Sequence, residues 1–162
     1  MERRLEIGCG PSPRSGYEHN DINPGPDIEH VGPIHDLDFP DGAFVEIFGT
    51  GAIEHLTYED ELPRFLREVR RVLGEFGQLC VVGPDYNRAT TNPAWFEMIP
   101  QIMHGDEEHP GNQHRWISTA WKNLLAVREV FPAAREIDIR AASVFWPIFD
   151  RVGWQFAILT EV

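Results

Sequence analysis

The sequence has few cysteines, few basic residues and no long hydrophobic run. Two cysteines in 162 residues cannot form a disulfide framework of the kind that holds small secreted domains together. A net charge of −12 argues against a nucleic-acid backbone or an anionic membrane as the main partner. No stretch approaches the ~18 apolar residues of a membrane span, and the N-terminus lacks the apolar part of a signal peptide. We therefore expect a cytoplasmic protein with no nucleic-acid or membrane partner.

The usual phosphate-binding motifs are also missing. No Gly-Lys-Ser/Thr occurs anywhere, which excludes a P-loop. A dinucleotide-binding turn has a third glycine five residues after the first, but Pro13 stands at that position after Gly8. Asp21 follows Gly8 by only 13 residues, which is too close for the acid of that fingerprint. Neither a nucleoside triphosphate nor NAD fits this pattern.

The composition is that of a globular protein, with 42% hydrophobic and 11% aromatic residues. The length suits one domain over residues 1–162, with a polar, lid-like segment at about 86–116. Cys9 and Cys80 fall in predicted strand or strand-end positions, and we expect both to be buried free thiols.

Apolar runs and turn residues predict alternating strands and helices. The best helix covers 60–73, where apolar residues recur with a period of 3.6, Asp60 can cap the start, and Gly74 and Gly77 can end it. A second helix is predicted over 118–130. Strands are predicted at 5–8, 17–22, 28–31, 44–48, 79–83, 136–139 and 155–160. This order indicates an α/β, Rossmann-like fold with a mostly parallel sheet, helices on both faces and an antiparallel C-terminal strand.

Glycines and carboxylates follow several of the predicted strands. Gly8, Cys9 and Gly10 lie at the end of the first strand, and Asp21 lies at the end of the second. The other residues of this kind are Asp36, which comes after the third strand, Thr50, which comes after the fourth, and Asp85, which comes after the fifth. Because ligands of open α/β sheets bind at the carboxyl ends of the strands, we expect these residues to meet at one site.

Six motifs in unbroken order between residues 4 and 88 resemble those of the S-adenosylmethionine-dependent class I methyltransferases. The closest match is the small, reduced type in which the helix after the first glycine turn is shortened or absent. The motifs are Glu-Ile-Gly-Cys-Gly-Pro (6–11), Asn-Asp-Ile (20–22), His-Asp-Leu-Asp-Phe-Pro-Asp (35–41), Ile-Glu-His-Leu (53–56), Leu-Arg-Glu-Val-Arg-Arg-Val-Leu (66–73) and Val-Gly-Pro-Asp (82–85).

This resemblance implies S-adenosylmethionine as cofactor and assigns residues to it. Gly8, Cys9 and Gly10 would pass under its methionine part, and Asp21 would bind the ribose hydroxyls. Two further sets complete the implied site: Asp36 with the Leu37 backbone at the adenine, and Thr50, Gly51 and the Glu54-His55 wall near the methionyl end.

The methyl acceptor requires a base with a pKa near neutrality if it is an oxygen or nitrogen, which favours histidine. Our candidates, in order, are His114, His109 and His55. A metal-dependent variant is an alternative in which His104, Asp106, Glu108 and His109 gather around an ion. Their spacing matches no tight ligand pattern, so we predict no metal.

The leading hypothesis is therefore a methyltransferase that acts on an oxygen or nitrogen of a small-molecule acceptor. The alternative is a non-catalytic cofactor-binding module of the same fold that regulates or binds a partner. A chain this short could complete its pocket with a neighbouring subunit, which would make a homodimer.

Overall fold

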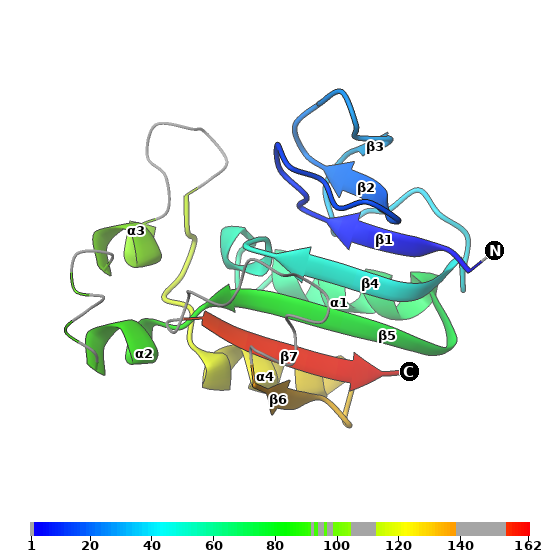
Figure 1. Cartoon of the computed structure of the whole chain (residues 1–162). Helices are drawn as coiled ribbons and strands as arrows, with labels where there is room; N and C mark the ends of the chain where they lie inside the picture. The colour runs from blue at the N-terminus through cyan, green and yellow to red at the C-terminus, as the bar shows by residue number, and fades with distance from the viewer. Residues whose placement is uncertain (1, 92, 94–95, 97–98, 105–112, 139–154) are drawn as a thin grey trace.

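The structure is a computed structural model that describes residues 2–91, 93, 96, 99–104, 113–138 and 155–162. Seven strands of this part form one sheet in the order β3-β2-β1-β4-β5-β7-β6 (Figure 1). The strands are β1 (Arg4–Ile7), β2 (Glu18–Asp21), β3 (His30–Val31), β4 (Phe44–Thr50), β5 (Leu73–Pro84), β6 (Arg135–Ile137) and β7 (Gln155–Glu161). The helices are η1 (Ile53–His55), α1 (Glu61–Val72), α2 (Tyr86–Thr91), α3 (Ile99–His104) and α4 (Ala120–Val130).

Six strands run in the same direction, and β7 alone runs against them. β1 pairs in parallel with β2 and β4, β2 pairs in parallel with β3, and β4 pairs in parallel with β5. β7 is antiparallel to both β5 and β6. The prediction of a mostly parallel Rossmann-like sheet with an antiparallel C-terminal strand is confirmed. The carboxyl ends of β1, β2 and β4 consequently share one edge of the sheet, beyond which α2 and α3 lie (Figure 1).

Helix α1 matches the predicted 60–73 segment closely, because its apolar residues form one buried face. Its start differs from the prediction. The Asp60 side chain makes no capping hydrogen bond. Thr57 Oγ1 instead accepts a hydrogen bond from the Glu61 amide (3.1 Å), and Glu61 Oε2 accepts one from the Thr57 amide (2.7 Å). This reciprocal pair resembles a capping box and satisfies the backbone amides of Thr57 and Glu61.

The prediction that Gly74 and Gly77 end this helix is wrong. The chain becomes extended at Leu73 and passes directly into β5, so both glycines lie inside the strand. The pairing with β4 moves from Leu73 to Gln78, and the four residues between them bulge out of register. Phe76 takes a positive φ of 63° at this bulge. The helix thus ends because Leu73 pairs with Phe44, a contact that helix-stop residues do not indicate.

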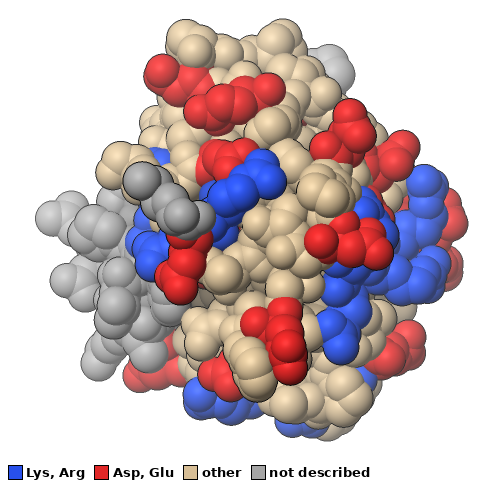
Figure 2. Space-filling view, turned by 90° about the vertical axis from the view of Figure 1, so that its right-hand side faces the viewer, with Lys and Arg blue, Asp and Glu red and all other residues tan. Residues whose placement is uncertain are grey.

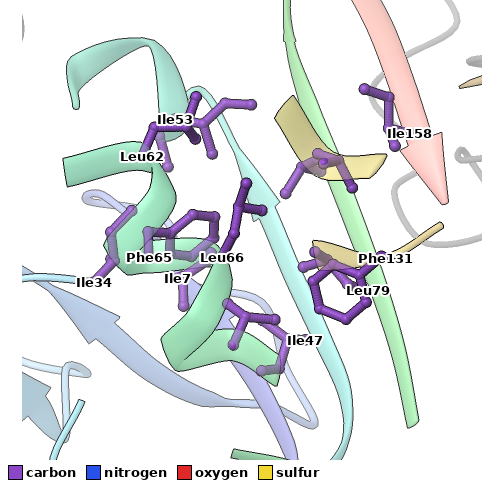
Figure 3. Packing of buried hydrophobic residues seen from close by; sticks show 14 of the residues in the cluster. Ile7, Ile34, Ile47, Ile53, Leu62, Phe65, Leu66, Leu79, Phe131 and Ile158 are labelled. Atoms are coloured by element: carbon purple, nitrogen blue, oxygen red, sulfur yellow. The ribbon is translucent and has the colours of Figure 1, made fainter. Parts of the chain in front are cut away.

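Helices α1 and α4 both cover the same face of the sheet, behind the strands in Figure 1. Their buried residues form one large core with alternate residues of the central strands, among them Ile7, Ile47, Leu79 and Ile158 (Figure 3). We predicted helices on both faces. In the described part of the chain the opposite face carries a smaller cluster around Phe48, and the Arg14 guanidinium lies 5.0 Å from the centre of the Phe48 ring. The difference arises because residues 8–17, which join β1 to β2, form turns instead of a helix.

Both cysteines are buried and free, as predicted. Burial raises the pKa of the Cys9 thiol and that of the Cys80 thiol to about 12. Neither thiol is therefore ionised near neutral pH, and both behave as small apolar residues in the packing.

Basic side chains lie next to carboxylates at several places. Arg3 pairs with Glu18 at 2.7 Å, and Arg71 pairs with Glu68 at 2.6 Å and with Asp41 at 2.8 Å. On the face shown in Figure 2, basic and acidic side chains are interspersed. No helix among the described residues is long and apolar enough to cross a membrane.

Candidate active site

A cavity of about 890 Å³ opens at the carboxyl ends of β1, β2 and β4. Its volume lies within the range of small-molecule sites. Six of the residues selected from the sequence line it, from five separate segments of the chain: Gly8, Gly10, Asp21, Gly51, His55 and His114. Of the residues expected to converge at this edge, Gly8, Gly10 and Asp21 line the cavity, whereas Cys9, Asp36, Thr50 and Asp85 are not part of its described lining.

The glycine turn after β1 is required by geometry. Gly8 and Gly10 have positive φ values of 60° and 61°, which other residues rarely adopt. A Cβ atom on Gly8 would lie only 2.8 Å from Ala52 Cβ, so the turns after β1 and β4 pack directly against each other. A Cβ atom on Gly10 would meet nothing within 4 Å. Gly10 therefore exposes its backbone to open space at the cavity.

Asp21 holds this glycine turn in place. Its Oδ2 accepts a hydrogen bond from the Gly10 amide at 2.9 Å, and its Oδ1 accepts one from the Asn23 amide at 2.8 Å. The side chain is buried, with 7% of the residue exposed. A carboxylate offers about four acceptor sites, so both oxygens keep capacity for a ligand hydroxyl. The glycine turn and the carboxylate that the resemblance assigns to two parts of one cofactor are thus in direct contact.

The predicted adenine-binding residues are arranged differently from expectation. Asp36 is exposed, and the Leu37 amide donates to Glu68 Oε1 at 3.1 Å. Of the described residues near this corner, Ile34 and His35 line the cavity, and Asp36 and Leu37 do not. His35 Nδ1 is buried without a hydrogen-bond partner. The polar atom available to a ligand here belongs to the residue preceding the predicted one.

Three other expected residues lie close to the cavity but outside its described lining. The Cys9 amide donates to the Asn20 carbonyl at 3.3 Å, which links the glycine turn to β2. Thr50 is the last residue of β4, directly before Gly51. Asp85 accepts a hydrogen bond from the Asn87 amide (3.1 Å) and lies 3.3 Å from the Arg88 guanidinium at the start of α2.

A buried carboxylate and two histidines meet on one wall of the cavity. Glu54 and His55 belong to η1, and His114 comes from the segment that returns after α3. His114 Nε2 lies 4.0 Å from Glu54 Oε1, and the two imidazole rings have their centres 5.0 Å apart. Burial raises the pKa of Glu54 to about 7 and lowers the pKa of His55 below its usual value. A carboxyl group with a raised pKa and an imidazole with a lowered pKa can both exchange protons with a substrate near neutral pH.

Backbone hydrogen bonds fix this arrangement. The Arg115 amide donates to the Glu54 carbonyl at 2.9 Å, and His55 Nδ1 lies 3.1 Å from the Gln113 carbonyl oxygen. The His114 amide donates to the His104 carbonyl at 3.1 Å. His114 is therefore held against η1 by bonds on both sides of it.

His109, the second candidate base, lies outside the described residues, as do Asp106 and Glu108 of the alternative metal set. Within the predicted lid-like segment, the described parts are α2, α3 and residues 113–116. His104 is exposed at the end of α3 and does not line the described cavity wall.

Sequence reasoning named Glu54 only as part of the pocket wall beside His55, and it did not select His35. Glu54 carries the clearest signal in hindsight, because it stands between apolar neighbours in Ile-Glu-His-Leu, just after a glycine turn. The described lining has four carboxylates (Asp21, Asp27, Glu54 and Glu61) and one guanidinium (Arg115). This balance suits a cationic ligand better than a phosphate.

Comparison with known proteins agrees with this geometry. Residues 14–81 match the methyltransferase domain family. No curated protein matches the chain. Many solved structures do match it.

Three of these structures illustrate the likeness. An S-adenosylmethionine-dependent methyltransferase from Thermotoga maritima is 15% identical, with a TM-score of 0.66, over 99% of this chain and 82% of that chain. One from Archaeoglobus fulgidus is 15% identical, with a TM-score of 0.66, over 100% and 86% of the two chains. Geranyl diphosphate C-methyltransferase from Streptomyces coelicolor, solved with Mg²⁺, geranyl diphosphate and S-adenosylhomocysteine, is 13% identical, with a TM-score of 0.62, over 99% and 70%.

The family match falls on the predicted cofactor half of the chain, and the fold likeness extends over its whole length. The chain is thus similar to the S-adenosylmethionine-dependent class I methyltransferases, in sequence over residues 14–81 and in fold over its whole length. The methyl donor of this class is S-adenosylmethionine, and the cavity is of the right size and charge for this sulfonium.

Proposed function

We propose that this methyltransferase transfers a methyl group to an oxygen or nitrogen of a small-molecule acceptor. The observation that carries the proposal is the shared cavity, which joins the Gly10–Asp21 corner to the wall formed by Glu54, His55 and His114. One part of the cavity is thus built for binding, and another part carries groups suited to proton transfer.

The first part would hold the cofactor. Gly8, Cys9 and Gly10 would offer bare backbone beneath its methionine portion, with Thr50 and Gly51 near the methionyl end, and Asp21 would accept hydrogen bonds from the ribose hydroxyls. Support comes from the open space at Gly10 and from the spare acceptor capacity of Asp21.

The adenine contact of Asp36 and Leu37 stays a prediction. It requires the Leu37 amide to leave Glu68. His35, whose buried Nδ1 has no partner, offers a second polar contact at the same corner.

The second part would handle the proton of the acceptor. When bound, S-adenosylmethionine supplies a methyl group on a sulfonium, and the methyl–sulfur bond breaks as its electron pair goes to sulfur. His114 would take the proton that the acceptor oxygen or nitrogen loses as its new bond to carbon forms. The Glu54 carboxylate, 4.0 Å away, would stabilise the resulting imidazolium. His55, kept neutral by burial, is the second candidate for this role, and His109 remains a prediction from the sequence.

Calorimetric titration with S-adenosylhomocysteine, followed by turnover assays over a panel of hydroxyl and amine acceptors, tests the proposal. We expect binding by the wild type and product from at least one acceptor class. We also expect His114→Ala to lower kcat by about 10²–10⁴-fold with binding of S-adenosylhomocysteine retained. A folded protein that does not bind S-adenosylhomocysteine would contradict the cofactor assignment.

Binding without turnover over the whole panel would favour the alternative, a non-catalytic regulatory or partner-binding module. The homodimer, the single-domain boundaries and the cytoplasmic location remain predictions, and sedimentation analysis of the purified chain tests the first of them.

A further inference from the structure

We infer that Glu54, His55 and His114 form a binding site for a divalent transition-metal ion on the wall of the cavity. One ligand atom from each residue lies within 4.8 Å of the other two. Two of these residues are adjacent in η1, and the third is almost 60 positions later in the chain. The inference goes beyond the proposed function, because methyl transfer as described above uses no metal.

The orientation of His55 supports the site. Its Nδ1 lies 3.1 Å from the Gln113 carbonyl oxygen, which can only accept, so Nδ1 carries the proton. Nε2 consequently has its lone pair available. Metal-ligating histidines commonly donate their other N–H to a backbone carbonyl in this way, which fixes both the tautomer and the ring orientation.

The environment of Glu54 supplies a second, independent observation. The residue is only 2% exposed, and its Oε2 has no hydrogen-bond partner. Among the described residues, no lysine or arginine forms an ion pair with this carboxylate, and its ion-pair partner is His114. A buried carboxylate with an unmatched oxygen is unfavourable unless it is protonated or faces a cation. A metal ion bound at Oε1 would supply that cation.

The donor set indicates which ion fits. Two imidazole nitrogens and one carboxylate oxygen suit Zn²⁺, Co²⁺ or Fe²⁺, whereas Mg²⁺ prefers oxygen ligands alone. Zinc bonds of about 2.0–2.2 Å place tetrahedral ligand atoms about 3.3–3.6 Å apart. Glu54 Oε1 and His114 Nε2, now 4.0 Å apart, would have to approach by a fraction of an ångström.

Three protein ligands leave one position open toward the cavity, as in catalytic zinc sites. An acceptor hydroxyl bound there would lose its proton to solvent more readily, because the ion stabilises the oxyanion. In the metal-bound protein this ion would replace His114 as the means of activating the acceptor.

The test is a titration of the complete, metal-stripped chain with cobalt(II) chloride, followed by visible absorption spectroscopy. Cobalt bound to two imidazoles and a carboxylate gives ligand-field bands that the aqueous ion lacks at comparable intensity. We expect these bands to saturate at one equivalent and to disappear when zinc chloride is added. Glu54→Gln and His114→Ala should each weaken cobalt binding by at least about 100-fold, because losing a direct ligand costs no less than losing a residue that orients one.

His30→Ala is the matched control. His30 also pairs with a carboxylate, Glu18 at 3.2 Å, but it does not line the cavity. This variant should bind cobalt as the wild type does. Circular dichroism and titration with S-adenosylhomocysteine verify that each variant is folded.

The inference is overturned if the folded wild type gives no cobalt bands, or if the bands persist in both Glu54→Gln and His114→Ala. The result is separate from the proposed function. Binding of S-adenosylhomocysteine without cobalt binding removes the metal site alone, and cobalt binding without any affinity for S-adenosylhomocysteine removes the cofactor assignment alone.

Discussion

The proposed cofactor site depends on the contact between Asp21 and the glycine turn at Gly10, and replacing Asp21 by asparagine tests this contact. The carboxylate accepts hydrogen bonds from two backbone amides, those of Gly10 and Asn23, one on each oxygen. An asparagine has the same shape but only one oxygen. Its NH₂ group would face one of the two amides, donor against donor, at a site that is 7% exposed.

The expected effect follows from the energy of such bonds. A hydrogen bond to a charged group contributes about 1.5–3 kcal/mol, and leaving a buried amide without its partner costs about 1–3 kcal/mol in all. We expect Asp21→Asn to lower the free energy of unfolding by about 2–3 kcal/mol. In a domain of this size that corresponds to a fall in Tm of roughly 4–12 °C. Because the glycine turn would lose its anchor, affinity for S-adenosylhomocysteine should fall roughly 30–100-fold.

Urea unfolding and calorimetric titration measure the two quantities independently. Asp38→Asn is the control, because it makes the same change of charge at an exposed position. It should leave both quantities close to those of the wild type. If Asp21→Asn unfolded at the wild-type urea concentration and bound S-adenosylhomocysteine normally, the proposed role of this carboxylate would be refuted.

Three further substitutions test other parts of the structure. Gly8→Ala should lower the free energy of unfolding, measured in urea, by about 1–3 kcal/mol more than Gly16→Ala does. Both positions have a positive φ, but only at Gly8 would the added Cβ lie 2.8 Å from a neighbouring Cβ. Equal losses would contradict this packing. Arg71→Ala should lower the free energy of unfolding by about 1–2 kcal/mol, because its partly exposed guanidinium donates hydrogen bonds from α1 to the loop after β3. Arg67→Ala, on the exposed face of α1, is the control and should change this free energy little. The pKa of Glu54 is raised in the folded state to about 7, so folding favours its protonated form. In chelator-containing buffer the wild type should therefore lose roughly 3 kcal/mol relative to Glu54→Gln as the pH rises from 5 to 8, and parallel stability profiles would contradict the raised pKa.

The elements that were predicted well carry strong local patterns. Helix α1 lies within one residue of the predicted bounds at each end, because the 3.6-residue period of its apolar side chains can be satisfied only by a helix with one buried face. The alternation of strands and helices likewise indicated the parallel sheet. Both patterns reflect which apolar side chains are buried, and the burial of apolar surface is the largest favourable contribution to folding.

The predictions that failed at the two ends of α1 were overturned by contacts that the capping and stop residues do not indicate. Asp60 is a good capping residue in isolation, but Thr57 and Glu61 satisfy the helix start between them. Gly74 is a good helix stop, but the pairing of Leu73 with Phe44 brings the chain into β5 first. The hydrogen bond from the Leu37 amide to a glutamate 31 positions away was not foreseen either, although the adenine contact of this residue stays a prediction. Local propensity cannot anticipate such a partner.

The sequence by itself determined the fold class and the end of the sheet at which a ligand binds. The glycines and carboxylates that follow the strands need only a parallel sheet to bring them together there. Only the tertiary structure decided which groups face one another across the cavity. Glu54 and His114 are 60 positions apart, and their contact depends on a backbone bond from Arg115 that no local pattern indicates. The physical reason is that side-chain periodicity encodes burial, whereas hydrogen-bond pairing and pKa depend on the positions of groups far away in the chain.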